Sequence, residues 1–263
     1  MIRLKNEKQI DGIRKSCKML SAMYRELIPL VKTGVETIEI DRWVHNWIIK
    51  AGGKPAFLGY GERAYPFPGS ICISINEEVI HGIPSRRRLK DGDLVSLDCG
   101  INLDGFISDQ ALSMEMGKVS PQVHRLSEVT RECLYAAIHA ARAGERLLQL
   151  ARAIQNRLNS ETYGVVHQFC GHGVGFAVHE DPQVVNVPHG PNPKLSGGMV
   201  LAIEPMINLG TGDVEMLEDH WTIVTADRRI SAHWEHTIAI FPDHTELLTD
   251  PLPGDPEAKS GPG

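Results

Sequence analysis

Apolar side chains recur every three or four positions along the first fifty residues, which is the spacing of one buried helix face. The repeat predicts one helix between residues 5 and 30 and a second from about Glu36. The second helix is expected to end at Gly52-Gly53, where glycine lets the chain leave the helical region without strain. The apolar positions are Ile10, Ile13, Cys17, Leu20, Met23 and Leu27 in the first helix, and Ile38, Ile40, Trp43, Val44, Trp47 and Ile48 in the second.

After an irregular stretch at 54–69, alternation of apolar and polar residues predicts strands. Residues 70–75 alternate like a half-buried strand. Two further predicted strands, 94–101 and 106–116, are joined by the hairpin turn Asn102-Leu103-Asp104-Gly105. The remaining elements are helices at 120–143, opened by Ser120-Pro121, and at 147–158, followed by strands from 198 to 241. Helices and strands come in blocks, so we expect an α+β fold with a mostly antiparallel sheet.

The length of 263 residues fits a single domain, which we expect over residues 1–250. The segment 251–263 lacks apolar residues for a core and is expected to be a disordered tail. The net charge of −6 gives no electrostatic argument for nucleic acid as the main partner or substrate, and the one basic cluster, 86–90, is typical of a solvated loop. No run of 18 apolar residues exists that would span a membrane.

A cytoplasmic location is expected from the N-terminus and from the cysteines. The first eight residues carry charges where a secretion signal requires an apolar stretch. The five cysteines are odd in number and widely spaced, without a C-x-x-C pair, so reduced thiols are expected.

The pair Asp98 and Asp109 is the first indication of chemistry. If the turn centre is Leu103-Asp104, the two aspartates lie directly opposite each other; if it is Asp104-Gly105, they are diagonal neighbours. Both registers put the carboxylates on one face of the hairpin, roughly 5 to 8 Å apart at Cβ. Facing like charges are unfavourable unless a cation neutralises them, whereas an aspartate at a strand end in water would need none.

Three more sites carry polar residues in unusual settings. His172 lies between glycines that allow close backbone approach, with His179 seven residues further on. Glu204 and Glu235 each interrupt an apolar run, and a buried carboxylate needs a salt-bridge partner or a metal. Together, four carboxylates and one imidazole suit two Mn, Fe, Co or Zn ions better than one structural zinc. Such a centre favours hydrolysis, and the pattern alone does not name the substrate.

At these residues the chain resembles type I methionine aminopeptidases, which have the pita-bread fold. The resemblance runs from about Leu4 to Leu248 and covers each motif in order. The motifs are Ser74-Ile75-Asn76-Glu77-Glu78-Val79-Ile80-His81-Gly82-Ile83-Pro84, Asp91-Gly92-Asp93-Leu94-Val95-Ser96-Leu97-Asp98, Asp104-Gly105-Phe106-Ile107-Ser108-Asp109, Gly171-His172-Gly173-Val174-Gly175 with His179-Glu180, Ile203-Glu204-Pro205-Met206, and Glu235-His236-Thr237.

The resemblance implies a curved, mostly antiparallel sheet flanked by helices in two pseudo-twofold halves. It implies two divalent ions (Co, Mn, Fe, Zn or Ni), with Asp98 on one, His172 and Glu204 on the other, and Asp109 and Glu235 on both. A bridging water or hydroxide activated by the metals would hydrolyse the bond after the initiator methionine of nascent proteins. Glu204 would be the proton acceptor, and His81 and His179 would contact substrate around that bond.

The methionine side chain is expected in an apolar, polarisable pocket. Its candidate residues are Phe57, Tyr60, Tyr65, Phe67, Cys72 and Trp221. The choice between Tyr65 and Phe67 stays open, because the segment 59–69 is slightly longer than in the bacterial enzymes that the chain resembles.

Two alternatives are weighed against this interpretation. A proline-directed peptidase of the same fold would carry an extra N-terminal domain, for which the segment before Ile71 leaves no room. A non-catalytic binding module, docking proteins or ribosomes, would lack metal ligands, and all five are present. The resemblance also predicts a monomer and leaves association with ribosomes open.

Overall fold

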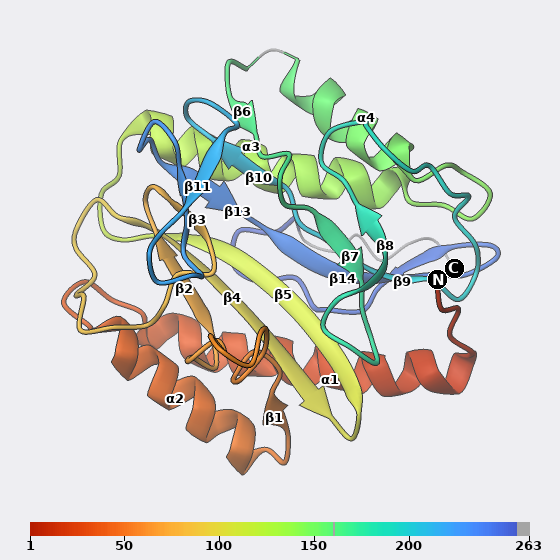
Figure 1. The fold of residues 1–263 in the computed structure, drawn as a ribbon, viewed down its shortest axis with the longest axis horizontal. Coiled ribbons are helices and arrows are strands. Elements are labelled where there is room, and N and C mark those ends of the chain that lie inside the picture. Colours follow the sequence, from red (N-terminus) through yellow and green to blue (C-terminus); the bar gives the residue numbers. More distant parts are fainter. Residues whose placement is uncertain (160, 257–263) are drawn as a thin grey trace.

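A curved antiparallel sheet of nine strands is flanked by two pairs of helices (Figure 1). The computed structural model describes residues 1–159 and 161–256. Its helices are α1 (Glu7–Leu27), α2 (Thr37–Lys50), α3 (Pro121–Ala140) and α4 (Leu148–Leu158), with a 3-10 turn at Ile28–Leu30. All four helices match predicted ones, with ends that differ by a few residues.

The strands are β1 (Lys54–Pro55), β2 (Cys72–Ile75), β3 (Glu78–Ile80), β4 (Leu94–Leu103), β5 (Phe106–Glu115), β6 (Gly164–Val165), β7 (Gly171–Gly173), β8 (Glu180–Val184), β9 (Val200–Ile203), β10 (Met206–Asn208), β11 (Val214–Met216), β12 (Ile223–Thr225), β13 (Ser231–His233), β14 (Glu235–Ile240) and β15 (Thr245–Leu247). The main sheet has the order β1-β4-β5-β14-β9-β7-β8, with β2 paired to β4 and β15 to β14. Each pairing between these described strands is antiparallel, which confirms the predicted α+β class.

The helix starts follow from local hydrogen bonding. Asn6 caps α1 by accepting from the backbone amide of Gln9, whose side chain accepts from Asn6 in return. Ser120 caps α3, and Pro121 fills the first turn, where no amide hydrogen is needed. The apolar face of α1 packs on β4 and β5, while α3 packs on β13, β10, β14 and β9. Each half of the chain therefore supplies a helix pair and part of the sheet.

The β4–β5 hairpin turns at Asp104-Gly105. Both residues have positive φ, 53° and 86°, and Leu103 pairs with Phe106. Asp98 consequently pairs with Ala111, two residues beyond Asp109 on the same strand face. Of the two registers left open by the sequence, the structure has the diagonal one.

Two expectations need correction. β2 is buried on both faces instead of one, since the Ser74 hydroxyl accepts from the Gly82 amide and so satisfies the inward polar group. The first part of the segment expected to be a disordered tail is packed against the core. Leu252 is 4% exposed in the core, and the Asp255 carboxylate lies 3.2 Å from His236 Nε2. The rest of that expected tail, 257–263, lies outside the described residues.

The basic side chains of the cluster at 86–90 lie on the surface, as expected. Arg87 and Arg88 pair with Glu78 and Glu36, and both arginines are substantially exposed. Within the described ranges, no helix is both long and apolar enough to cross a membrane.

Candidate metal centre

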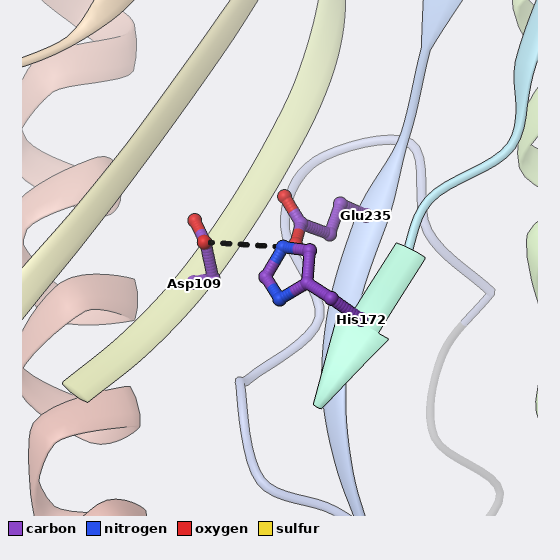
Figure 2. Close-up of side chains that lie close together, drawn as sticks. All are labelled: Asp109, His172 and Glu235. Carbon is purple, nitrogen blue, oxygen red and sulfur yellow. Dashed lines mark ion pairs between the residues drawn. The ribbon is translucent and has the colours of Figure 1, made fainter. Parts of the chain in front are cut away.

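Neighbouring strands of the main sheet bring the predicted metal ligands together. Asp109 lies on β5, Glu235 on β14 and His172 on β7, and their side chains point toward one another (Figure 2). One potential ligand atom from each of these three buried residues lies within 4.8 Å of the others. Residues separated by up to 126 positions thus meet because β5, β14, β9 and β7 are consecutive in the sheet.

Asp98 and Glu204 complete the set. Asp98, on β4, and Glu204, directly after β9, line the same cavity as the other three ligands. Glu204 Oε1 lies 3.3 Å from His172 Nε2, which in turn lies 3.9 Å from Asp109 Oδ2. All five predicted ligands therefore converge.

Burial makes this concentration of acids unfavourable for negative charge. It raises the pKa of Asp98 to about 7 and that of Glu204 to about 8. Burial and the neighbouring carboxylates raise the pKa values of Asp109 and Glu235 well above the ordinary range. Between residues 1–159 and 161–256, no lysine or arginine pairs with any of the four carboxylates.

The unpartnered atoms fit divalent cations. Asp98 Oδ1, Asp109 Oδ1 and Glu235 Oε1 are buried without a hydrogen-bond partner. Burial lowers the pKa of His172 to about 3, so its ring is neutral. Its Nδ1 is 3.0 Å from the Gly173 carbonyl and must donate to it, which directs the Nε2 lone pair to the carboxylates. Oxygen-rich sites with one imidazole suit Mn, Fe, Co or Zn, whose charge offsets that of the acids.

His81 and His179 line the same cavity. The His179 ring lies 4.2 Å from the His172 ring, and its Nδ1 is 2.6 Å from the Tyr60 hydroxyl. Burial lowers the pKa of His81 to about 4, and its φ of 59° turns the backbone sharply after β3. Both rings are therefore neutral hydrogen-bonding groups beside the acids near pH 7.

Five of the six predicted pocket residues line the cavity. They are Phe57, Tyr60, Phe67, Cys72 and Trp221. Tyr65 is the exception and corrects that part of the prediction. Its residue is 51% exposed, and only its carbonyl contributes, by accepting from Trp221 Nε1 at 2.9 Å.

The sequence reasoning missed several residues. Ile80, Phe169 and Cys170 also line the cavity. Their positions close to His81 and His172 in the sequence were the available signal. His233 was missed as well: it is buried, and its Nε2 lies 3.4 Å from Glu204 Oε2. Its position two residues before Glu235 could have indicated this.

Comparison with known proteins places this centre in a class. Residues 11–241 match the model of metallopeptidase family M24, so the chain belongs to that family. This membership implies that the buried Asp-His-Glu cluster binds divalent metal.

Similar proteins show which kind of M24 metallopeptidase the chain is. A methionine aminopeptidase from Treponema pallidum is 53% identical over 95% of this chain and 97% of its own length. The crystal structure of methionine aminopeptidase from Rickettsia prowazekii superposes with a TM-score of 0.91 at 35% identity, covering 95% of this chain and all of that one. Within family M24, the chain therefore belongs with the methionine aminopeptidases.

The proline-directed alternative shares only the fold. A prolidase from Pyrococcus furiosus superposes with a TM-score of 0.77 at 23% identity. The match covers 95% of this chain but 66% of the prolidase.

Proposed function

We propose that the chain removes the N-terminal methionine of proteins with two divalent metal ions. The observation that carries the proposal is the buried cluster of Asp109, His172 and Glu235, whose ligand atoms gather within 4.8 Å. Asp109 and Glu235 would serve both ions, Asp98 one, and His172 with Glu204 the other. The unpartnered carboxylate oxygens and the absence of basic partners among the described residues support this ligand set.

Glu204 is the proposed proton acceptor. Bound divalent ions would supply an acidic water molecule and polarise the substrate carbonyl. A general base works best with a pKa near the working pH. Burial raises the pKa of Glu204 to about 8 in metal-free protein, and bound cations would lower it again. Its Oε1 lies 3.3 Å from His172 Nε2 and its Oε2 lies 3.4 Å from His233 Nε2.

His179 and His81 are the proposed hydrogen-bonding groups for the scissile peptide. His179, held by the Tyr60 hydroxyl, would donate to the carbonyl oxygen as negative charge develops there. His81, which lines the same cavity, would assist the departing amine. Trp221 packs edge-on against the His81 ring at 5.9 Å and limits its rotation.

The side-chain pocket supports methionine as the terminal residue. Phe57, Phe67 and Cys72 are almost fully buried, and Trp221 closes the wall by an edge contact with Phe67 at 5.2 Å. Aromatic rings and a thiol make a polarisable apolar surface, which suits a thioether. Burial keeps the Cys72 thiol protonated, because it raises its pKa well above the ordinary value.

Chelation and metal replacement test this proposal. Protein stripped with a chelator should lose hydrolysis of Met-Ala-Ser, and Mn, Co, Fe, Zn or Ni added back separately identifies the ions that restore it. Leu- and Pro-initiated peptides serve as controls. Full activity after chelation, or a preference for the control peptides, contradicts the proposal. Calorimetric titration should give two ions per chain, and a stoichiometry of one removes the second ion.

The remaining parts of the proposal concern location, domain organisation and association with other molecules. A cytoplasmic location agrees with the five free cysteines of the chain, four of them buried. A single catalytic domain, which we now extend to include Leu252, agrees with the burial of that residue in the core. A monomeric state and association with ribosomes stay predictions.

A further inference from the structure

His233 is a buried histidine for which the proposed chemistry has no use. Its side chain is 1% exposed, and neither ring nitrogen has a hydrogen-bond partner. A neutral imidazole offers one N–H donor and one lone pair, and buried polar groups in native proteins are normally paired.

The main chain fixes where this ring lies. His233 pairs with Met206 across β13 and β10, and Met206 follows Glu204 by two residues. Ser113 holds the His233 backbone, since its hydroxyl lies 3.0 Å from both the His233 amide and the His233 carbonyl. The ring therefore faces Glu204 through the strand register rather than through a flexible loop.

Glu204 lies between two imidazoles. Its Oε1 is 3.3 Å from His172 Nε2, and its Oε2 is 3.4 Å from His233 Nε2. Its backbone carbonyl accepts from Asn186 Nδ2 at 3.1 Å, so the residue is held from the main chain as well. The two carboxylate oxygens thus have different surroundings, one on the metal cluster and one on His233.

We propose that His233 is a positioning residue for Glu204: its Nε2–H donates to Glu204 Oε2 and leaves Oε1 free for the metal centre. His233 does not line the cavity, whereas Glu204 does. It therefore acts through Glu204 and not on substrate. This inference rests on the proposed role of Glu204 in metal binding and proton transfer.

Two substitutions separate the donor from the volume of the ring. His233→Gln keeps an N–H donor at a similar reach, whereas His233→Leu keeps an apolar side chain without a donor. The leucine variant should lower kcat on Met-Ala-Ser or the affinity of metal-free protein for Mn²⁺ by about 10- to 100-fold, with a smaller change in KM. The glutamine variant should restore both quantities to within about threefold of wild type.

A double-mutant cycle checks that the effect passes through Glu204. In a Glu204→Ala background, which removes the acceptor, His233→Leu should change the calorimetric Mn²⁺ affinity by less than about threefold. An equal loss in both backgrounds, or a leucine variant with wild-type kcat and affinity, would overturn the proposal. If circular dichroism shows that the leucine variant is unfolded, His233→Met replaces it. A wild type that binds Mn²⁺ but cleaves no Met-initiated peptide refutes the proposed function, while the calorimetric comparison still decides the role of His233.

Discussion

Glu204 differs from the other buried carboxylates because burial alone raises its pKa, to about 8, whereas neighbouring charges add to the shifts of the rest. Its oxygens lie nearest two histidine nitrogens, and its own charge raises the pKa values of Asp98, Asp109 and Glu235. Proton exchange at Glu204 is therefore linked to the charge of the other three acids.

Glu204→Gln should abolish turnover while the fold survives. The amide keeps the shape of the side chain but cannot accept a proton, so kcat on Met-Ala-Ser should fall by about 10²- to 10⁴-fold. Steady-state kinetics with excess Mn²⁺ and circular dichroism are the measurements. Glu26→Gln, at an exposed position of α1, is the matched control and should leave kcat unchanged. Undiminished hydrolysis by Glu204→Gln would remove its assigned role.

The sequence predicted the acidic ligands because each one is conspicuous in an apolar strand. It could not select among side chains that are ordinary in their local context. Tyr65 looks like a pocket residue from composition, yet it is 51% exposed and its ring lies tilted against that of His220, with 4.0 Å between the ring centroids. His233 looks like a routine strand residue, and only the pairing of β13 with β10 brings it to Glu204.

At the scale of elements, the β4–β5 turn decides how the first two ligands meet. Alternation fixed the face that Asp98 and Asp109 share, but two turn centres satisfy it equally. The choice depends on which residues adopt positive φ, and the structure gives this conformation to Asp104 and Gly105. A pattern of apolar residues carries no information on that point, so the register was left open.

Replacing Gly105 tests the turn. No heavy atom lies within 4 Å of a Cβ added at Gly105, so the change introduces backbone strain without a clash. Gly105→Ala should lower the free energy of unfolding by about 1–2 kcal/mol, because φ is 86° there. Gly105→Asn should cost less, since asparagine tolerates this region. Urea unfolding measures both, and equal stability of all three proteins would argue against a positive φ at this turn.

The segment after β15 is a second place where the prediction was wrong, because it was made from composition. Polar and proline-rich segments lack the apolar area to fold alone, but one leucine placed in an existing core is enough to anchor them. Leu252 does so at 4% exposure, and Asp255 accepts from the Leu252 amide at 2.8 Å. The prediction failed because the anchoring surface belongs to other elements.

Shortening the chain measures this anchor. A chain ending at Asp250 should be less stable than one ending at Pro256 by about 2–3 kcal/mol, the value of burying one leucine plus its polar contacts. Leu252→Ala in the longer chain should reproduce most of the loss. Thermal or urea unfolding of the metal-loaded proteins provides the values. Equal stability of the two chain lengths would mean that Leu252 contributes nothing to the core.

At the scale of the whole molecule, folding forces together acids that repel one another. The hydrophobic core and the sheet hold four buried carboxyl groups whose charged forms are disfavoured. Metal-free protein must therefore protonate these groups or lose stability, and bound cations remove the conflict. Metal binding and folding are thus linked through the protonation of the site.

The raised carboxyl pKa values make metal-free protein less stable as pH rises. Asp98 and Glu204 have folded pKa values of about 7 and about 8, above the roughly 3.9 and 4.3 expected in the unfolded chain. Between these values the folded state binds more protons, so stability falls as pH rises. His81 and His172, with folded pKa values lowered to about 4 and about 3, act in the opposite direction, but only below the unfolded histidine value of about 6.5. Above pH of about 6.5 the histidines no longer oppose the carboxyl effect, and the buried cysteines, whose pKa values are also raised, add to it as pH approaches the unfolded thiol value of about 8.5.

Chelated protein should consequently lose stability between pH values of about 6.5 and 8.5, whereas protein saturated with Mn²⁺ should lose much less. The difference in Tm between the two forms should widen across this range, as calorimetry at both pH values would measure. The Asp98→Asn, Glu204→Gln double variant is the control for titration elsewhere in the chain. Its chelated form should show a flatter dependence, because two of the responsible protons are gone. A chelated wild type with the same Tm at both pH values would mean that the buried acids already carry their charge, and that cations are not what makes their proximity tolerable.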